Sequence, residues 1–319
     1  MIVALELGLI YAIMALGVYL TFKILDFPDL TVDGSFTTGA ATAAVLITQQ
    51  VNPLLAMGAA FLVGTLAGLI TGLLHAKGNI NPLLAGILTM LALYSVNLRI
   101  MGNRANAPLL GQETVFTWFS QAGLRGTWGA VIILLICVLI IKFALDWFLS
   151  TDMGLALQST GDNQEMIRSF GVSTDRMKII GLMLSNGLVA LCGSIIAQYQ
   201  GSADISMGIG LILVGLASVI IGQAIFGTRT VIIATFAVVV GAVLYRLAIQ
   251  YALTAGLNPN DMRLISAVLV VAALLLPQWK IFRRFSLRRK NKKVENLNKE
   301  AAEEAAVEAE EAGKVGHRA

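Results

Sequence analysis

Charged residues are scarce in this 319-residue sequence, and their scarcity excludes most classes of soluble protein. Asp, Glu, Lys and Arg make up 13% of the chain, whereas apolar residues make up 57%. A soluble domain carries roughly a quarter charged residues and about 45–50% apolar ones. Together with a mean hydropathy of +0.78, this composition indicates a protein embedded in a membrane.

Cysteine and histidine are also rare, with two residues of each. Cys137 and Cys192 lie in separate apolar runs and have no CxxC spacing, so no metal site is predicted. We expect both to be small buried apolar side chains. The chain also lacks a G-x-x-x-x-G-K-[ST] loop and any paired nucleophile and base. The sequence therefore predicts neither ATP hydrolysis nor another enzyme activity in this chain.

Long apolar runs predict an all-α, polytopic bundle of membrane-spanning helices. A span needs about 20 mostly apolar residues to cross a hydrocarbon core of about 30 Å. Nine segments fit, and a total of eight to ten is compatible with the sequence. The candidates are 3–22, 34–50, 54–74, 82–101, 127–149, 178–200, 208–226, 230–252 and 262–279. Segment 34–50 is small and polar, so we expect it to pack inside the bundle rather than face lipid.

The distribution of Lys and Arg predicts the orientation of the spans. We divide the chain into a transmembrane domain, 1–279, and a tail, 280–319, that is basic and then rich in Ala and Glu. The tail holds 11 of the 23 Lys and Arg residues, which suits a cytoplasmic surface with anionic headgroups rather than nucleic acid. Alternating spans then place 18 of these residues inside and 5 outside. The five are Arg99, Arg104, Arg125, Arg246 and Arg263.

This orientation puts the N-terminus outside and the charged block 159–178 in the cytoplasm. The start of the chain has no basic n-region and no obvious cleavage site, so we expect a retained first span.

The block 159–178, STGDNQEMIRSFGVSTDRMK, predicts a short amphipathic helix from Asp162 to Phe170. Either Asp162 or Asn163 is a suitable N-cap, and Gly171 is a suitable stop. A helix of about 10 residues is unstable alone in water, so we expect the bundle and a partner's groove to support it. The residues of the predicted contact are Asp162, Asn163, Glu165, Met166, Ile167, Arg168, Phe170 and Gly171. Met166, Ile167 and Phe170 form its apolar face, with Glu165 and Arg168 at the rim.

Residues 165–171, EMIRSFG, resemble the coupling-helix signature of ABC importer permeases, which is a Glu, two small or apolar residues, three variable ones and a Gly. The wider run 159–201 is similar to the permease branch for branched-chain amino acids, ribose and nucleosides. Two further stretches agree with that branch: DLTVDGSFTTGAATAA and GIGLILVGLASVIIGQAIFGTR. The resemblance covers most of 26–250. Met166 and Ile167 replace the alanines of the commoner signature, and the Ile-x-Leu-Pro of sugar-type permeases is absent.

The resemblance implies the permease subunit of a binding-protein-dependent ABC importer in the plasma (inner) membrane. Its expected partners are a second permease, identical or different, two ATPase subunits that carry ATP and Mg, and an extracellular or periplasmic solute-binding protein. The expected solute is a small polar metabolite, first a branched-chain or aromatic amino acid, then a nucleoside or sugar. The alternatives are a stand-alone ion-coupled secondary transporter or channel and a membrane scaffold, with 159–178 an ordinary solvated loop helix.

Polar side chains within the spans are candidates for a substrate path, because such groups are costly in a membrane. They are Ser35, Thr38, Asn97, Ser185, Asn186 and Gln198. Hydrogen bonding between helices is the alternative role. The sequence shows no chain of carboxylates inside the spans, which argues against a proton-coupled pump.

Two loops carry further candidates. The outer segment 102–126 offers Arg104, Glu113 and Trp118 as a dock for the binding protein, or else a short interfacial helix with its aromatic residues at headgroup level. The loop DFPDLTVDG is expected to face the cytoplasm. There Asp33 is predicted to cap the helix that follows it rather than to bind a cation.

Overall fold

Helices make up nearly all of the computed structural model, which describes residues 1–124, 126–255 and 262–275. Each of the nine predicted spans corresponds to one helix. The helices are α1 (Ile2–Tyr19), continued by the π-helical turn η1 (Leu20–Ile24), α2 (Thr31–Thr48), α3 (Pro53–Ala76), α4 (Pro82–Ile100), α6 (Trp128–Ser150), α9 (Thr174–Gln200), α10 (Leu211–Phe226), α11 (Val231–Thr254) and α12 (Met262–Leu275). The shorter elements are α5 (Val115–Gln121), α7 (Asp152–Asp162), α8 (Gln164–Ser169), β1 (Asn106–Pro108) and β2 (Ser202–Asp204).

Six of the helices in the described part of the chain are long and apolar enough to cross a membrane. They are α1 with η1, α3, α4, α6, α9 and α11. The other three predicted spans correspond to α2, α10 and α12, which have 18, 16 and 14 residues. A multi-pass, all-α membrane bundle is therefore confirmed.

Several predictions fall outside the described residues, namely those for Arg125, the end of the span 262–279 and the tail 280–319. Within the chain, 1–270 form one compact unit, and 271 onwards are assigned to a second.

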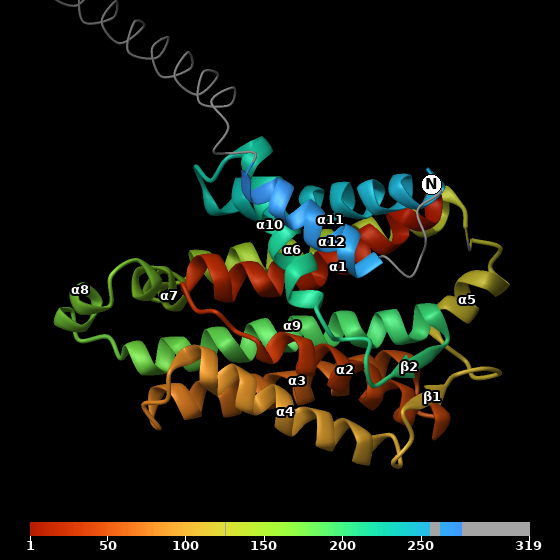
Figure 1. Cartoon of the computed structure of the whole chain (residues 1–319), viewed down its shortest axis with the longest axis horizontal. Helices are drawn as coiled ribbons and strands as arrows, with labels where there is room; N and C mark the ends of the chain where they lie inside the picture. The colour runs from red at the N-terminus through yellow and green to blue at the C-terminus, as the bar shows by residue number, and fades with distance from the viewer. Residues whose placement is uncertain (125, 256–261, 276–319) are drawn as a thin grey trace, which may run out of the picture. The chain divides into compact units, whose positions relative to one another are not determined.

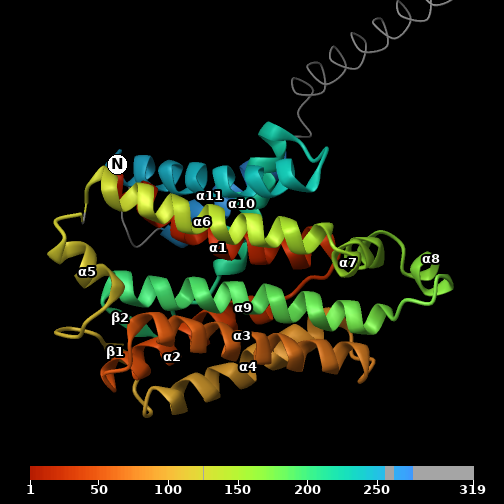
Figure 2. The same cartoon turned by 180° about the vertical axis from the view of Figure 1, so that it is seen from behind.

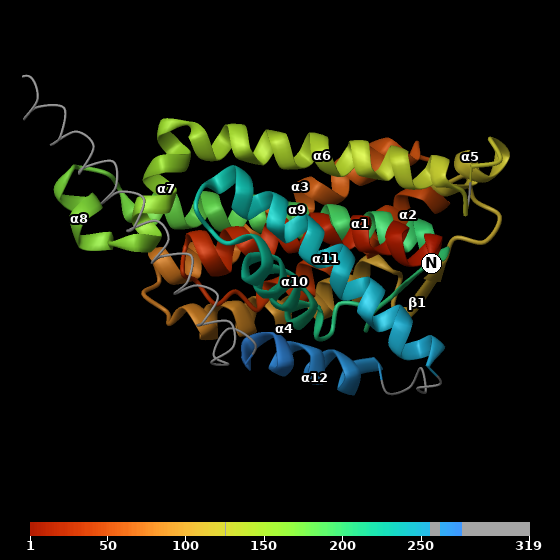
Figure 3. The same cartoon turned by 90° about the horizontal axis from the view of Figure 1, so that it is seen from above.

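The long helices lie side by side, and their connections gather at two ends of the bundle. Figures 1 and 2 show α7 and α8 together at one end, and the N-terminus, α5, β1 and β2 at the other. Figure 3 shows the same separation from above. The strands β1 and β2 pair antiparallel, with Ala107 opposite Ala203. We name the two ends the α8 end and the α5 end.

Helix α9 lies at the centre of the bundle and packs against α1, α2 and α3. Small residues make this packing close. A Cβ atom placed on Gly68 of α3 would lie 2.2 Å from the Leu182 carbonyl oxygen, and one on Gly39 of α2 would lie 1.9 Å from the Ala190 oxygen. Glycine lets helix backbones approach in this way, and small residues are common at such contacts in membranes.

Helix α2 packs inside the bundle, as its small and polar sequence predicts. Its alanines Ala40, Ala41, Ala43 and Ala44 are fully buried. Because α2 is enclosed by α3, α4 and α9, it does not require the strongly apolar surface of a helix that contacts lipid.

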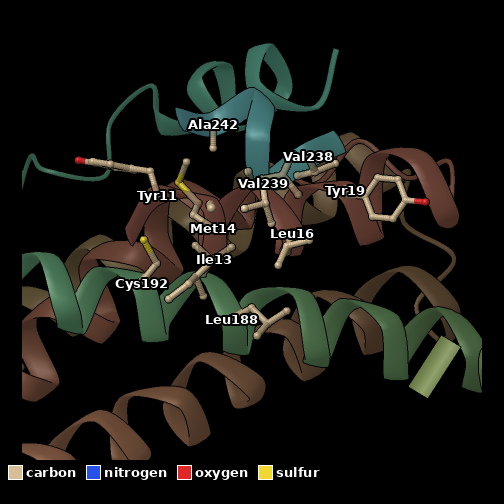
Figure 4. Close-up of a cluster of buried hydrophobic side chains, with 14 of the residues drawn as sticks. Tyr11, Ile13, Met14, Leu16, Tyr19, Leu188, Cys192, Val238, Val239 and Ala242 are labelled. Carbon is tan, nitrogen blue, oxygen red and sulfur yellow. The ribbon is translucent and has the colours of Figure 1, made fainter. Parts of the chain in front are cut away.

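A second apolar contact joins α1, α9 and α11. Figure 4 shows Met14 and Leu16 of α1 between Leu188 and Cys192 of α9 and the valines of α11. Cys192 is buried there, as predicted, but Cys137 is exposed on α6. The prediction for Cys137 is wrong because α6 packs only one of its faces against the bundle. Of the residues in the most apolar 18-residue stretch of α6, 28% are buried.

Basic residues do not lie only at the ends of the helices. Lys142 is 2% exposed within α6 and forms an ion pair with Asp146 one turn later, and Asp146 accepts a hydrogen bond of 2.7 Å from the hydroxyl of Thr235 on α11. Arg246 lies within α11, about two turns before its last residue, Thr254. The orientation argument had placed Lys142 and Arg246 at the two membrane surfaces, and their positions inside helices correct it.

The close contact between α3 and α9 gives a direct test. We expect Gly68→Ala to lower the free energy of unfolding by about 1–3 kcal/mol, because the added methyl group collides with the α9 backbone. Gly58→Ala on the same helix is the matched control, since a Cβ atom there meets nothing within 4 Å. Thermal unfolding of the purified protein in detergent would compare them. Equal midpoints for the two variants would contradict the close packing.

Candidate coupling segment and translocation path

The short helix predicted from Asp162 to Phe170 is present as α8 (Gln164–Ser169), and the charged block 159–178 also includes the end of α7 and the start of α9. Asn163, not Asp162, caps α8, because its Oδ1 atom accepts hydrogen bonds from the backbone N–H groups of Glu165 and Met166 at 3.1 and 3.0 Å. Asp162 is instead the last residue of α7. Gly171 has a φ of +82°, a conformation that suits glycine directly after a helix. The predicted stop is therefore confirmed.

The predicted apolar face of this segment divides between two environments. Ile167 is 9% exposed, whereas Met166 is 47% and Phe170 is 73% exposed. Adjacent positions 166 and 167 point about 100° apart on a helix, so they cannot share one face fully. The surface that α8 offers to a partner therefore consists of Met166 and Phe170, without Ile167.

Arg168 connects α8 to the start of α9 instead of lying free at a rim. Its Nε atom donates a hydrogen bond of 2.8 Å to the hydroxyl of Thr174, and its guanidinium lies 3.7 Å from the Asp175 carboxylate. The Asp175 contact is exposed and stabilises by at most about 1 kcal/mol. Glu165 is exposed in the first turn of α8, where its negative charge suits the helix dipole.

Three of the polar residues near the bundle centre form a hydrogen-bonded cluster. The Ser35 hydroxyl donates to Oδ1 of Asn186 at 2.6 Å, and the Asn186 amide donates to the Asp29 carboxylate at 2.7 Å. Asp29 also accepts from the backbone N–H of Thr31 at 2.9 Å, which caps α2. Because these side chains are at most 2% exposed, they link α2 to α9 and do not line an open path here.

Other predicted path residues have the same role. Ser185 donates a hydrogen bond of 2.7 Å to the carbonyl of Gly17 on α1. Thr38 and Asn97 both donate to the carbonyl of Gly34, at 2.9 and 3.4 Å. These groups donate to neighbouring backbone, which is the alternative role that the sequence left open. The buried Oδ1 atom of Asn97, however, has no hydrogen-bond partner in the described part of the chain.

Asp33 caps a helix that lies far away in the sequence. Its two carboxylate oxygens accept hydrogen bonds from the backbone N–H groups of Gly210 and Ile212, at 2.7 and 2.9 Å. Segment 205–210 follows β2 and returns beside α2, so that α10 begins next to the first turn of α2. The capping prediction was right for the side chain and wrong for the helix. Its partner is 177 residues away, and no local pattern could indicate it.

The aspartates of this loop are also more enclosed than the sequence predicts. We expected the loop 26–34 to face the cytoplasm. Asp29, however, is 2% exposed and contacts Asn186, which lies near the middle of α9. The loop therefore enters the bundle at Asp29, whereas Asp26 remains exposed.

Buried carboxylates are present, although they form no continuous chain among the described residues. Glu6 accepts a hydrogen bond of 2.8 Å from the hydroxyl of Tyr199, and Asp29 accepts one from Asn186. Asp146 pairs within α6, as described above. Each carboxylate has at least one local partner, as is usual for buried polar groups, although Oε1 of Glu6 has none among the described residues.

The α5 end has a cavity of about 780 Å³, which one of the three predicted docking residues, Glu113, lines. Glu113 and Gln198 line it, and Gln198 also accepts a hydrogen bond of 3.1 Å from the backbone N–H of Val115. Arg104 is exposed on the same segment, and Trp118 is half-buried on α5. Gln198 is thus the one predicted path residue that borders a described cavity.

Aromatic packing fixes α5 to the bundle. Phe116 is 5% exposed, and its ring lies 4.9 Å from that of Tyr199, edge to face. It is therefore a buried residue of the bundle. Nearby, the hydroxyl and backbone N–H of Ser206 hold the pKa of Asp204 below its usual value, because they donate hydrogen bonds to its carboxylate.

Comparison with known proteins agrees with this arrangement. Residues 1–275 match the family described as branched-chain amino acid transport system / permease component. The chain belongs to this family of ABC importer permeases. It is therefore a multi-pass transport subunit of the plasma membrane.

Relatives of this permease carry names for different solutes. It is 45% identical over 267 residues to a tyrosine transport system permease protein of Clostridioides difficile, covering 84% of this chain and 88% of the relative. It is 27% identical to the ribose import permease of Escherichia coli over 83% and 81% of the two chains. For the galactose/methyl galactoside import permease of Escherichia coli, the identity is 26% over 70% and 66%. No solved structure matches the permease.

The Asp33 cap can be tested in the purified permease. We expect Asp33→Asn to lower the free energy of unfolding by about 1–3 kcal/mol, because an amide has one acceptor oxygen where two N–H groups need acceptors. Asp26→Asn makes the same change at an exposed position of the same loop and should be neutral. The measurement is thermal unfolding in detergent. A midpoint for Asp33→Asn that matches the control would show that the cap does not stabilise α10.

Proposed function

We propose that this permease forms the translocation path of an importer for an amino acid with a branched or aromatic side chain. The observation that carries the proposal is its 45% identity, over most of both chains, to a permease named for tyrosine transport. A sugar is the second candidate, supported by the ribose and galactose permeases at 27% and 26% identity. The higher identity favours the amino acid.

The partners follow from the same family. Two ATPase subunits with ATP and Mg would drive transport, since this chain has no phosphate-binding loop. A solute-binding protein would deliver the amino acid, and a second permease, identical or not, would complete the membrane part. Exposed apolar residues on α3, such as Leu55 and Leu62, are available for lipid and for that second permease.

We assign ATPase contact to the α8 end, which we place in the cytoplasm together with the C-terminus. Phe170 and Met166 are the exposed apolar side chains that would enter a groove of the ATPase, with Glu165 beside them. Asn163 and Gly171 define the ends of α8. The other three residues of the predicted contact connect α8 to α7 and α9, and they would affect ATPase binding only by positioning α8. They are Asp162, Ile167 and Arg168.

The N-terminus and the α5 end are then outside. There the cavity lined by Glu113 and Gln198 would receive the solute. The exposed Arg104 and the half-buried Trp118 would contact the binding protein.

The coupling assignment predicts an effect of Phe170→Ala on subunit assembly. We expect the variant to lose most of the ATPase that co-purifies with the wild-type permease, because an apolar anchor in a groove contributes strongly to binding. Amino acid uptake driven by ATP should fall in parallel. The protein level in the membrane should not change, since the Phe170 side chain is 73% exposed.

Phe143→Ala is the matched control, because that phenylalanine is 59% exposed but lies on α6, away from α8. It should retain both the ATPase and the uptake. Unchanged co-purification for Phe170→Ala would refute the coupling role. Uptake by the permease alone, driven by an ion gradient and indifferent to ATP, would favour a secondary transporter.

The orientation predicts opposite labelling of two exposed glutamates. In a Cys137→Ala background, a membrane-impermeant maleimide added to intact cells should modify a cysteine at Glu113 and not one at Glu165. Both sites are exposed, and the remaining Cys192 is buried. Permeabilised cells should show both sites modified. Labelling of the Glu165 position from outside would reverse the proposed topology.

A further inference from the structure

Arg246 is a basic side chain inside the bundle that lacks a counter-charge among the described residues. Arg246 lies within α11, and its guanidinium carbon is 4.4 Å from the centre of the Tyr11 ring on α1. In the described part of the chain Arg246 forms no ion pair, and its buried Nε atom has no hydrogen-bond partner. Ionised groups at membrane depth are costly and commonly mark a functional site.

The contrast with Lys142 makes this feature specific. Lys142 is the other basic residue found well inside a spanning helix, and it pairs with Asp146 on the same helix. The start of α10, which faces the same region as Arg246, is likewise neutralised by the Asp33 carboxylate. Arg246 is thus left without the anionic partner that the fold supplies to these two groups.

Arg246 borders a cavity of about 280 Å³ between α1, α10, α11 and α12. Tyr11 and Ser266 supply the hydroxyl groups of its wall, and most of the remaining wall is apolar, including Leu213, Val214 and Ile249. In Figure 4 the ring of Tyr11 extends away from the apolar cluster around Met14 and Cys192. The cavity therefore combines one cation and two hydroxyls with an apolar surface.

This combination selects among solutes. A guanidinium binds a carboxylate through paired, charge-assisted hydrogen bonds. An apolar wall accommodates a hydrocarbon or aromatic side chain, whereas a sugar would need a polar partner for most of its hydroxyls. Ligand cavities commonly measure about 300–1,000 Å³. This cavity lies just below that range, so it has room for only one small molecule.

We propose that this cavity is a solute site of the permease, in which Arg246 binds the carboxylate of an amino acid and the apolar wall contacts its side chain. The inference rests on the proposed function and gives it a location and a chemical basis. An importer requires only weak, transient binding inside the membrane, and a site with one ionic contact meets that requirement.

The test is photolabelling of the permease assembled with its ATPase in lipid nanodiscs, without binding protein. The probe is free 4-azido-L-phenylalanine, whose azide reacts with neighbouring groups on illumination. We expect labelled peptides from 209–214 and 245–249. L-Tyrosine and 3-(4-hydroxyphenyl)propionate should compete, because both have the carboxylate. Tyramine, which lacks it, should not.

Two variants separate the role of the charge from that of the space. Arg246→Met should lower labelling by about tenfold or more, because it removes the charge-assisted contact. Arg99→Met is the matched control, since Arg99 is exposed at the end of α4, and it should leave labelling unchanged. Leu213→Trp should also abolish labelling, by filling the cavity while the arginine remains.

The outcomes distinguish this inference from the proposed function. Labelling elsewhere in the chain, equal competition by tyramine, or wild-type labelling of Arg246→Met would overturn the site. None of these results would affect ATP-driven amino acid uptake, which is measured separately with the binding protein present. If that uptake is absent while the ATPase co-purifies, the proposed function fails instead.

Discussion

Inside a membrane every backbone N–H group needs an acceptor within the protein, and this constraint explains the centre of the bundle. Helix α10 begins beside the first turn of α2, and the N–H groups of Gly210 and Ile212 need acceptors there. Asp33 supplies the two acceptor oxygens and is itself held by the first turn of α2. Asp29 supplies the corresponding acceptor at the start of α2. The carboxylates therefore let the chain enter the bundle from both ends.

Most of the fold could be predicted from the sequence, because the membrane imposes a length and a composition on each span. All nine predicted segments are helices, and the buried position of α2 followed from its small residues. The paired strands β1 and β2 were missed, since three residues carry no strand pattern. The exposure of Cys137 was missed because an apolar run does not distinguish the side of a helix that meets protein from the side that meets lipid.

The candidate sites were predictable only where their determinants are local. The end of α8 at Gly171 could be predicted from adjacent residues, whereas the division of the apolar face between the buried Ile167 and the exposed Phe170 could not. The partners of Asp33, Ser35 and Asn186 depend on helices that meet only after folding. Polar residues in a span therefore indicated that hydrogen bonds would form between helices, but not which groups would be the partners. Arg246 was assigned to a membrane surface because counting charges gives no depth.

The link between Arg168 and Thr174 has a mechanical consequence. The hydrogen bond joins α8 to the first residue of α9, a helix of 27 residues. Small residues pack α9 so closely against its neighbours that it cannot shift without moving them. A push on α8 by another subunit would therefore be transmitted along the whole thickness of the bilayer by one stiff element.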